Sequence, residues 1–388
     1  MSDLPTEKDF IRVFSDVFRL KNKPLLSGSE FDDCAALRLD SFAKNLSGES
    51  LTFSTDTVRE STDFPNGTTL WQKGWMSAAV NLSDLAAMGS KPIAFLFSAG
   101  LPKGFTLKDT EEFARGIQDC VSFFGAEVIG GDTEINNELT ITGTVIGLSE
   151  NKTLLLRKNA QPGDLLCVTG FPGSAGVSLS VLLNEIQTNI SNGSVGSVSD
   201  SFLKNLTEPF PRIFEGLMLA KSGAVHSMID TSDGLASSVY ELSTLSGVFF
   251  EIDEQSLPFD SEALDILSCH LKNQNENQSV TDEQIAAKAH ALLVHEALYT
   301  GGDYELLFTI PSGKLSLVEE LFEIFNQNAA SRFESLPSSG KTGRSPCQFT
   351  VIGKAIADKE NVIIRHAGLN SQRQPLLKIG YDSFKKYI

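Results

Sequence analysis

One segment near residue 80 limits the folds open to this chain more than any other feature. Residues 68–88 have helical spacing and stop before Gly89, and the stretch A-A-V-N-L-S-D-L-A-A-M at 78–88 is apolar on nearly all sides. A helix of this kind is buried, so we expect other elements to pack around it. It nevertheless carries Asn81, Ser83 and Asp84. A buried carboxylate needs either a basic partner or a bound cation, and the sequence leaves both interpretations of Asp84 open.

Strand-like and helical segments alternate along the rest of the chain. Before residue 150 we expect helices at 6–20 and 107–124 and strands at 34–39, 51–54, 93–97, 127–129 and 139–148. After it we expect helices at 175–186, 213–221 and 234–245 and strands at 165–169, 225–229, 248–252, 306–310 and 349–352. This alternation predicts a mixed α/β fold.

The turn sequence Q-P-G-D at 161–164 marks the expected boundary between two units. A chain of 388 residues is long enough for two domains. We therefore expect an N-terminal domain at 1–150 and a C-terminal α/β domain at 151–388.

The charge balance and the cysteines exclude several classes of protein. The chain has 49 acidic and 32 basic residues, a net charge of −17 that repels nucleic acid and anionic membranes. The five cysteines show no C-x-x-C or metal-binding spacing, which is typical of reduced thiols. The first ten residues do not resemble a signal peptide, and no apolar run approaches the length of a membrane span. We expect a cytoplasmic protein with no nucleic-acid or membrane partner.

Familiar phosphate-binding and catalytic motifs are absent. There is no G-x-x-x-x-G-K-[ST], H-R-D or D-F-G sequence, and the first of the five histidines is His226. Zinc chemistry and a Ser-His-Asp triad are therefore disfavoured, and no side chain is assigned as a catalytic acid, base or nucleophile. The segment G-F-P-G-S-A-G at 170–176 either presents backbone amides to a phosphate or is a plain tight turn into a helix.

Aspartate supplies the main functional signal. Six of these residues stand out, and most of them lie where strands are expected to end or helices to begin: Asp33, Asp56, Asp84, Asp132, Asp230 and Asp233. Taken singly, Asp56 and Asp132 are also consistent with a turn or a cap, and Ser232 or Asp233 with a helix N-cap. Taken together, hard oxygen ligands in this number suit several Mg²⁺ ions, which in turn bind substrate phosphates.

At this point the sequence resembles the thiamine-monophosphate kinases. The matching segments occur in the family's order: F-D-D-C-A-A (31–36), S-T-D-T (54–57), A-V-N-L-S-D-L-A-A-M-G (79–89), G-G-D-T (130–133), Arg157 before P-G-D (162–164), I-D-T-S-D-G-L (229–235) and G-G-D-Y-E-L (301–306). The wider superfamily is named for aminoimidazole ribonucleotide synthetase. It also includes selenophosphate synthetase and a hydrogenase maturation protein.

The resemblance implies a fold and a set of site residues. Two α/β domains form the subunit, the N-terminal domains of a homodimer pair into a β-barrel, and ATP with several Mg²⁺ lies between the domains. The implied metal positions are Asp33, Ser54, Thr55, Asp56, Asp84, Asp132, Asp230 and Asp233. The implied ATP contacts are Gly131, Asp132, Arg157 and Ser232, and Tyr381 matches an aromatic residue that covers the thiamine.

Two acceptor positions depart from the family pattern. Asp63 stands where the family has His, and Gly302 stands where it has a substrate-binding Glu, for which Asp303 or Glu305 could substitute by a one-residue shift. The leading hypothesis is ATP-dependent phosphorylation of thiamine monophosphate to thiamine diphosphate. The alternatives are a superfamily enzyme with another phosphorylated or carboxylated acceptor, and a binding protein that keeps the scaffold without catalysis.

The implied reaction agrees with the missing histidine. A phosphate monoester has a second pKa of about 6, so its oxygen is already largely ionised near neutral pH and needs no strong base. Direct in-line transfer needs charge neutralisation and alignment of two phosphates, which metals held by carboxylates supply.

Overall fold

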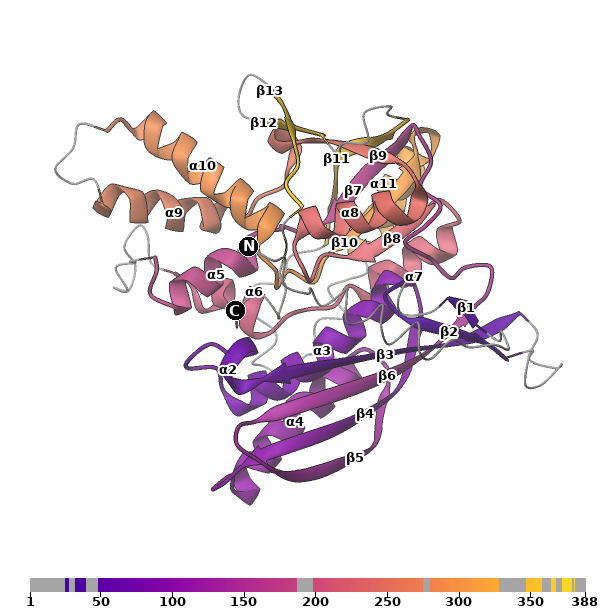
Figure 1. The fold of residues 1–388 in the computed structure, drawn as a ribbon, viewed down its shortest axis with the longest axis vertical. Helices are drawn as coiled ribbons and strands as arrows, with labels where there is room; N and C mark the ends of the chain where they lie inside the picture. Colours follow the sequence, from indigo (N-terminus) through magenta and orange to yellow (C-terminus); the bar gives the residue numbers. More distant parts are fainter. Residues whose placement is uncertain are drawn as a thin grey trace, which may run out of the picture.

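The computed structural model contains two β-sheets, one above the other in Figure 1, with helices between and around them. It describes residues 25–27, 32–39, 48–186, 198–274, 280–327, 347–357, 364–367, 372–378 and 380. The predicted mixed α/β fold is confirmed. The helix expected at 6–20 lies outside the described residues.

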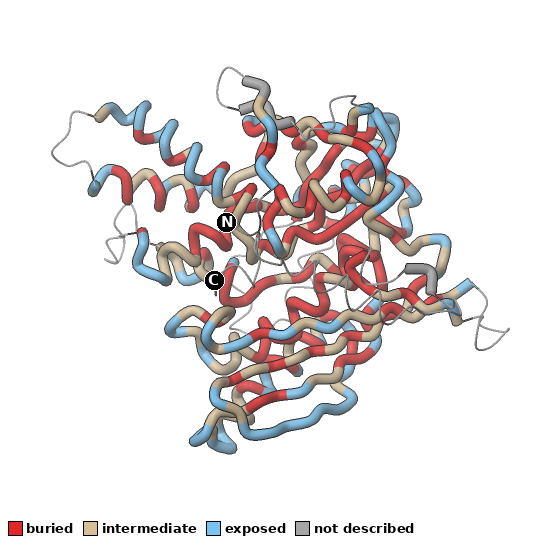
Figure 2. The backbone as a smooth tube through the Cα atoms, viewed as in Figure 1, coloured by how far each residue is buried: buried red, intermediate tan, exposed pale blue. Residues whose placement is uncertain are grey.

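The N-terminal sheet has six described strands in the order β1-β2-β3-β6-β4-β5. Their bounds are β1 Leu25–Ser27, β2 Ala35–Arg38, β3 Glu49–Arg59, β4 Lys91–Pro102, β5 Glu127–Asn136 and β6 Thr140–Glu150. Neighbouring strands are antiparallel except β4 and β5, which are parallel. Helices α3 (Leu70–Ala87) and α4 (Leu107–Phe123) cover one face, and Figure 2 shows the edge strand β5 largely exposed. The described part of the sheet does not close into a barrel.

The C-terminal sheet has seven described strands in the order β13-β12-β9-β11-β7-β10-β8. Their bounds are β7 Asp164–Thr169, β8 Ser227–Asp230, β9 Phe249–Asp253, β10 Leu306–Pro311, β11 Phe349–Ile356, β12 Ile364–Ala367 and β13 Gln372–Pro375. The remaining helices are α2 Glu60–Asp63, α5 Ser174–Leu182, α6 Asp200–Thr207, α7 Ile213–Ser222, α8 Leu235–Ser246, α9 Ser261–Gln274, α10 Asp282–Tyr299 and α11 Leu315–Gln327, with 3-10 turns at Glu254–Ser256 and Ser312–Lys314.

Helix α3 lies at the centre of the molecule, as its sequence predicts. A capping box of Thr69 and Gln72 starts it, and 13 of its 18 residues are buried. Side chains of α3 pack into one hydrophobic cluster with Val58 of β3, Ile213 of α7 and Phe308 of β10. This helix therefore joins the two sheets, and Asp84 near its end faces the junction.

Two predicted strand ends are wrong. Strand β5 continues through Gly130, Gly131 and Asp132, and β3 continues past Asp56. A Cβ on Gly131 would lie 2.8 Å from the carbonyl oxygen of Phe97 on β4. The glycine therefore permits a close approach of two strands and does not mark the end of one.

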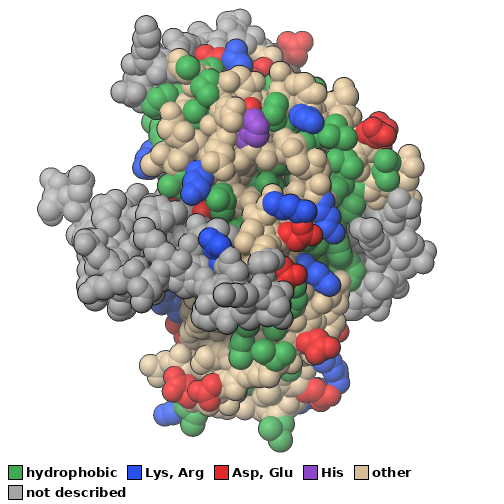
Figure 3. Space-filling view, turned by 90° about the vertical axis from the view of Figure 1, so that its right-hand side faces the viewer, with side chains coloured by type: hydrophobic (Ala, Val, Ile, Leu, Met, Phe, Trp, Pro, Cys, Tyr) green, Lys and Arg blue, Asp and Glu red, His purple; other side chains and the backbone are tan. Residues whose placement is uncertain are grey.

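The molecular surface mixes charges of both signs. Figure 3 shows Lys and Arg side chains interspersed with Asp and Glu on the face turned to the viewer. Among the described helices, none combines the length and hydropathy that a membrane crossing requires.

Candidate active site

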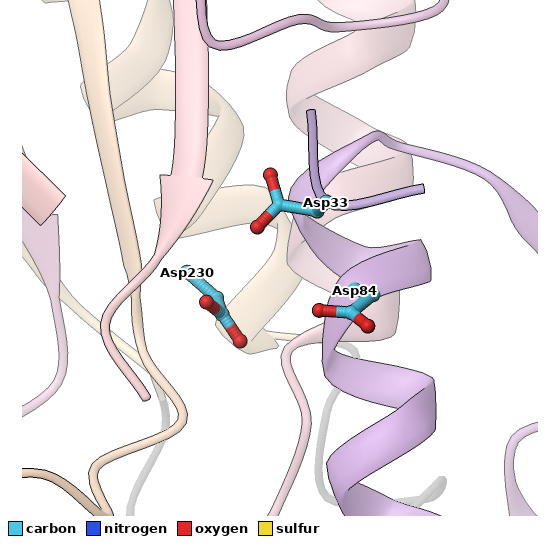
Figure 4. A group of neighbouring side chains, drawn as sticks. All are labelled: Asp33, Asp84 and Asp230. Atoms are coloured by element: carbon cyan, nitrogen blue, oxygen red, sulfur yellow. The ribbon is translucent and has the colours of Figure 1, made fainter. Parts of the chain in front are cut away.

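Three carboxylates from three different elements meet at the junction of the two sheets. Asp33 precedes β2, Asp84 lies on α3 and Asp230 ends β8, and one oxygen of each lies within 4.8 Å of the others (Figure 4). Asp56 on β3 lies beside the same group, because its side chain hydrogen-bonds with Asp84 and its backbone N–H donates to Asn81 Oδ1 at 3.0 Å. Four of the predicted metal residues therefore lie together.

Their surroundings disfavour negative charge. Burial, followed by the charges of Asp56, Asp230 and Asp33, raises the pKa of Asp84 well above its usual range. Burial and the charge of Asp33 raise the pKa of Asp230 to about 7. Burial also raises the pKa of Asp56, although its side-chain hydrogen bond with Asp84 opposes the rise. A bound cation would relieve this repulsion.

Arg157 is the basic partner of the cluster. Of the four carboxylates Asp33, Asp56, Asp84 and Asp230, it forms an ion pair with Asp33. Its Nε and Nη2 donate to the two Asp33 oxygens at 3.1 and 2.8 Å, and its backbone N–H donates to Asp32 Oδ1. Within the described residues, Asp84 forms no ion pair with Lys or Arg. The described residues thus give no support to Asp84 as half of a buried salt bridge, and the cation interpretation is favoured.

Three serine hydroxyls orient the carboxylates. Ser54 donates to Asp84, Ser83 donates to Asp230 Oδ2 at 2.6 Å, and Ser232 donates to Asp230 Oδ1 at 3.0 Å. The sequence indicated Ser83 as an unusual polar residue on an apolar helix, but its contact with a residue so distant in the chain had no sequence signal. Ser83 therefore fixes Asp230 of one sheet relative to Asp84 beside the other.

Thr55, Gly131 and Asp132 do not join the cluster within one chain. The Thr55 hydroxyl donates to the carbonyl of Gly143. Asp132 is exposed on the edge strand, in register with Ser98 of β4. Ser98 is paired in turn with Thr142 of β6, and Thr142 with Thr57 of β3. The side chains of this row, including that of Asp132, lie on the sheet face that points away from α3. Two strands separate β5 from β3.

The cluster lines a cavity of about 1620 Å³ between the two sheets. The cavity also includes Arg157, Ser232 and Asp233. Part of its wall is apolar, formed by Phe64, Met76, Val80, Leu179, Leu183 and Leu206. A charged region beside an apolar one suits a ligand with both phosphate and ring portions.

The predicted acceptor residues lie on this cavity as far as they are described. Asp63 Oδ2 accepts hydrogen bonds from the Arg59 N–H and the Thr62 hydroxyl. The Asp63 side chain therefore bonds back to the residue that begins the short helix α2. Gly302 has φ +104°, and a Cβ there would lie 3.3 Å from Leu206. A Glu at this exact backbone conformation would be strained. Tyr381 lies outside the described residues.

Neither neighbour of Gly302 is available to replace a missing Glu. Asp303 accepts from the backbone N–H groups of Gly173 and Ala175 at the start of α5, and Glu305 is paired with Arg212. The suggested substitution by a loop shift is therefore wrong for this structure. In segment 170–176 the amides of Gly173 and Ala175 bind the chain's own carboxylate, which favours the interpretation of this segment as a tight turn into a helix.

Comparison with known proteins gives a consistent set of relatives. Residues 31–149 match the family model of AIR synthase related protein, N-terminal domain. Thiamine-monophosphate kinase of Methanospirillum hungatei is 38% identical over 285 residues, which cover 73% of this chain and 81% of that one. The solved thiamine-monophosphate kinase from Stenotrophomonas maltophilia is 25% identical, with a TM-score of 0.63 and coverage of 92% and 95%. AaThiL complexed with AMPPCP and TMP is 22% identical, with a TM-score of 0.67 and coverage of 98% and 97%.

Proposed function

The chain belongs to the thiamine-monophosphate kinase family and is a phosphotransferase, and we propose that it phosphorylates thiamine monophosphate to thiamine diphosphate with ATP. The observation that carries this proposal is the carboxylate cluster on a cavity that also has an apolar wall. The kinase AaThiL, which has the same fold, was solved with an ATP analogue and TMP.

The donor set fits Mg²⁺. Asp33, Asp56, Asp84 and Asp230 offer hard oxygen ligands, and Arg157 alone does not balance their charge. Ser54, Thr55 and Asp233 also line this cavity and are further proposed metal positions. When bound, Mg²⁺ neutralises the phosphate oxygens and aligns donor and acceptor for direct in-line transfer. The hydroxyls of Ser83 and Ser232 hold the Asp230 carboxylate in place by hydrogen bonds.

Phosphate recognition is assigned to groups at the same end of the cavity. We propose that Arg157 and Ser232 contact the ATP phosphates. Arg157 is held in place by Asp33 and its backbone bond to Asp32, so its orientation is fixed before a nucleotide binds. The acceptor phosphate is its own nucleophile near neutral pH, and no side chain is needed as a strong base.

Gly131 and Asp132 enter the proposal through a homodimer. The side chains of Asp132 and Thr55 lie on the sheet face that points away from α3, and β5 is an exposed edge strand with Ile129 57% exposed. We propose that a second copy packs there to form a shared barrel, and that the contribution of Asp132 to metal and ATP binding depends on this second copy.

The residues at the acceptor end of the cavity suggest a second candidate function. Asp63 and Gly302 line the cavity in place of the residues typical of the family. These two positions favour testing a superfamily enzyme with a different phosphorylated or carboxylated acceptor. The apolar wall and the Asp63 carboxylate suit a cationic ring, which supports thiamine monophosphate as the first choice.

An assay of ADP release at millimolar Mg²⁺ tests the proposal. We expect release to depend on thiamine monophosphate and to be absent with unphosphorylated thiamine. Release with another phosphorylated or carboxylated compound, and none with thiamine monophosphate, would establish the second candidate. Nucleotide binding without release on any acceptor would indicate a binding protein.

A further inference from the structure

A second ionic cluster, formed by Arg212, Glu215 and Glu305, lies outside the set of residues that line the cavity and apart from the proposed metal site. Arg212 precedes α7, and its Nε donates to Glu305 Oε2 at 2.7 Å while its Nη2 donates to Glu305 Oε1. The two side chains are only 17% and 12% exposed. Glu215 lies farther from the same guanidinium, at 3.7 Å. The tight bidentate partner of Arg212 is therefore Glu305.

The surrounding structure is built to receive this pair. Thr169 at the end of β7 donates its hydroxyl to Glu305 Oε2 at 2.6 Å and accepts from the Leu306 N–H at 2.8 Å. A Cβ on Gly170 would lie 2.0 Å from Glu305 Oε1. Glycine at 170 thus leaves room for the carboxylate, and any other residue there would displace it.

Glu305 belongs to the loop of residues 300–305, which lines the cavity. The Thr231 N–H donates to the Glu305 carbonyl at 3.0 Å, and the Thr231 hydroxyl donates to the Asp303 carbonyl at 2.8 Å. The Gly302 N–H donates to the Ser232 carbonyl at 2.8 Å. The loop is therefore bonded to the turn that follows Asp230, and the Arg212 pair anchors it from the opposite side.

The loop presents Tyr304 to the cavity. Tyr304 lines the cavity together with Asp56 and Asp230 of the carboxylate site and with Asp63 of the acceptor end. Tyr304 and Glu305 are consecutive residues of the loop, so a shift of the backbone at Glu305 also moves Tyr304.

We propose that Arg212 is a positioning residue for the reaction: through Glu305 it holds the 300–305 loop, and with it Tyr304, in the geometry that the acceptor requires. A buried ion pair contributes little net stability compared with an apolar pair of the same shape, so its value here lies in fixing one arrangement. A displacement of about 1 Å at a reacting centre can cost on the order of a hundredfold in rate. This inference rests on the proposed function for its kinetic test.

The test compares Arg212→Met with Arg212→Lys in the full-length chain. For Arg212→Met we expect kcat/KM for thiamine monophosphate to fall by about ten- to a hundredfold, with the KM for ATP little changed. Arg212→Lys restores the charge without the bidentate geometry and should recover part of the loss. Arg115→Met is the matched control, because Arg115 pairs with Glu111 on the exposed surface. It should leave both constants unchanged.

Hydrogen exchange provides a readout that does not need activity. Arg212→Met should speed exchange in peptides covering 300–306 and 229–235 and leave α4 unaffected. Should Arg212→Met fail to fold, Thr169→Val removes one of the bonds to Glu305 and should show the same pattern more weakly. Folded Arg212→Met with wild-type acceptor KM and kcat, and unchanged exchange in the loop, would overturn the inference. If the wild type is inactive with thiamine monophosphate, only the proposed function is contradicted. Hydrogen exchange in the loop still tests whether the Arg212–Glu305 pair holds it in place.

Discussion

Asp84 is the residue on which the site depends most. Four carboxylates face one another with a single paired arginine, and Asp84 receives the charges of the other three. A structural role alone does not explain such an arrangement, because it places repelling groups in the core. A role in holding cations does.

Asp84→Asn should abolish phosphoryl transfer and leave the protein folded. It removes one ligand charge near the transferring group, and it also removes a buried charge that the metal-free protein disfavours. We therefore expect a higher Tm than wild type without metal, and a smaller rise in Tm on adding Mg²⁺. Asp109→Asn, at an exposed helix cap, is the control and should keep full turnover. Near wild-type turnover of Asp84→Asn at saturating Mg²⁺ would refute the metal assignment, and failure to fold would favour a structural role.

Asp303 should make stability depend on pH. Burial raises its pKa from 3.8 to about 7, although two backbone N–H groups of α5 oppose the rise. The folded protein then holds the proton more strongly than the unfolded chain, so this stabilising contribution is complete below 3.8 and is lost as the pH rises through about 7. Urea unfolding across this window should show a flatter pH dependence for Asp303→Asn. Asp282→Asn, 86% exposed, serves as control; identical slopes for wild type and Asp303→Asn would contradict the account.

At the scale of elements, α3 and α4 meet through glycine. A Cβ on Gly116 of α4 would lie 1.9 Å from the Trp71 carbonyl oxygen, and one on Gly74 of α3 would lie 2.1 Å from the Phe113 carbonyl oxygen. The two helices cover one face of the N-terminal sheet together. Their close packing thus supports the position of Asp84.

Gly116→Ala should lower the free energy of unfolding by about 1 to 3 kcal/mol or more, because the helices must separate to admit the methyl group. Gly313→Ala is the control, since a Cβ there meets open space. Urea unfolding of both variants measures the difference. Equal stability of Gly116→Ala and wild type would show that the helices adjust without cost.

Local pattern predicts those elements whose signal is local. The apolar run with a terminal glycine predicts α3, and alternation predicts β6. The sequence patterns do not predict helices α2, α6, α9, α10 and α11. They also do not predict that β5 continues through two glycines, of which Gly131 is needed there because it lies in close contact with Phe97. The candidate aspartates were predictable by type and place. Their meeting, and the bond of Ser83 to Asp230, depend on how distant segments pack, which no short pattern encodes.

For the whole molecule, the change from one sheet to the other agrees with the proposed domain boundary. Strand β6 ends at Glu150 and β7 begins at Asp164 in the second sheet. We propose domains at 1–150 and 151–388, with α3 packed against both. The cavity lies where they meet, so its shape depends on their relative position.

The proposed homodimer predicts a solution mass of twice 42.0 kDa. Ile146→Asp places a charge on the open face of the N-terminal sheet and should shift the mass toward the monomer and lower turnover. Leu317→Asp, on exposed α11, is the control. Light scattering at micromolar concentration measures both. A wild-type mass near 42.0 kDa would count against the dimer.

The central claim is that this chain transfers the terminal phosphate of ATP to thiamine monophosphate with Mg²⁺ held by the carboxylate cluster. Reaction with ATP labelled at the γ-phosphate, followed by separation of the products, tests it most directly. We predict that the label appears in thiamine diphosphate, that chelation of Mg²⁺ prevents this, and that Asp84→Asn does the same. Label found only in inorganic phosphate or in a different acceptor, or transfer that persists without divalent cations, would contradict the account.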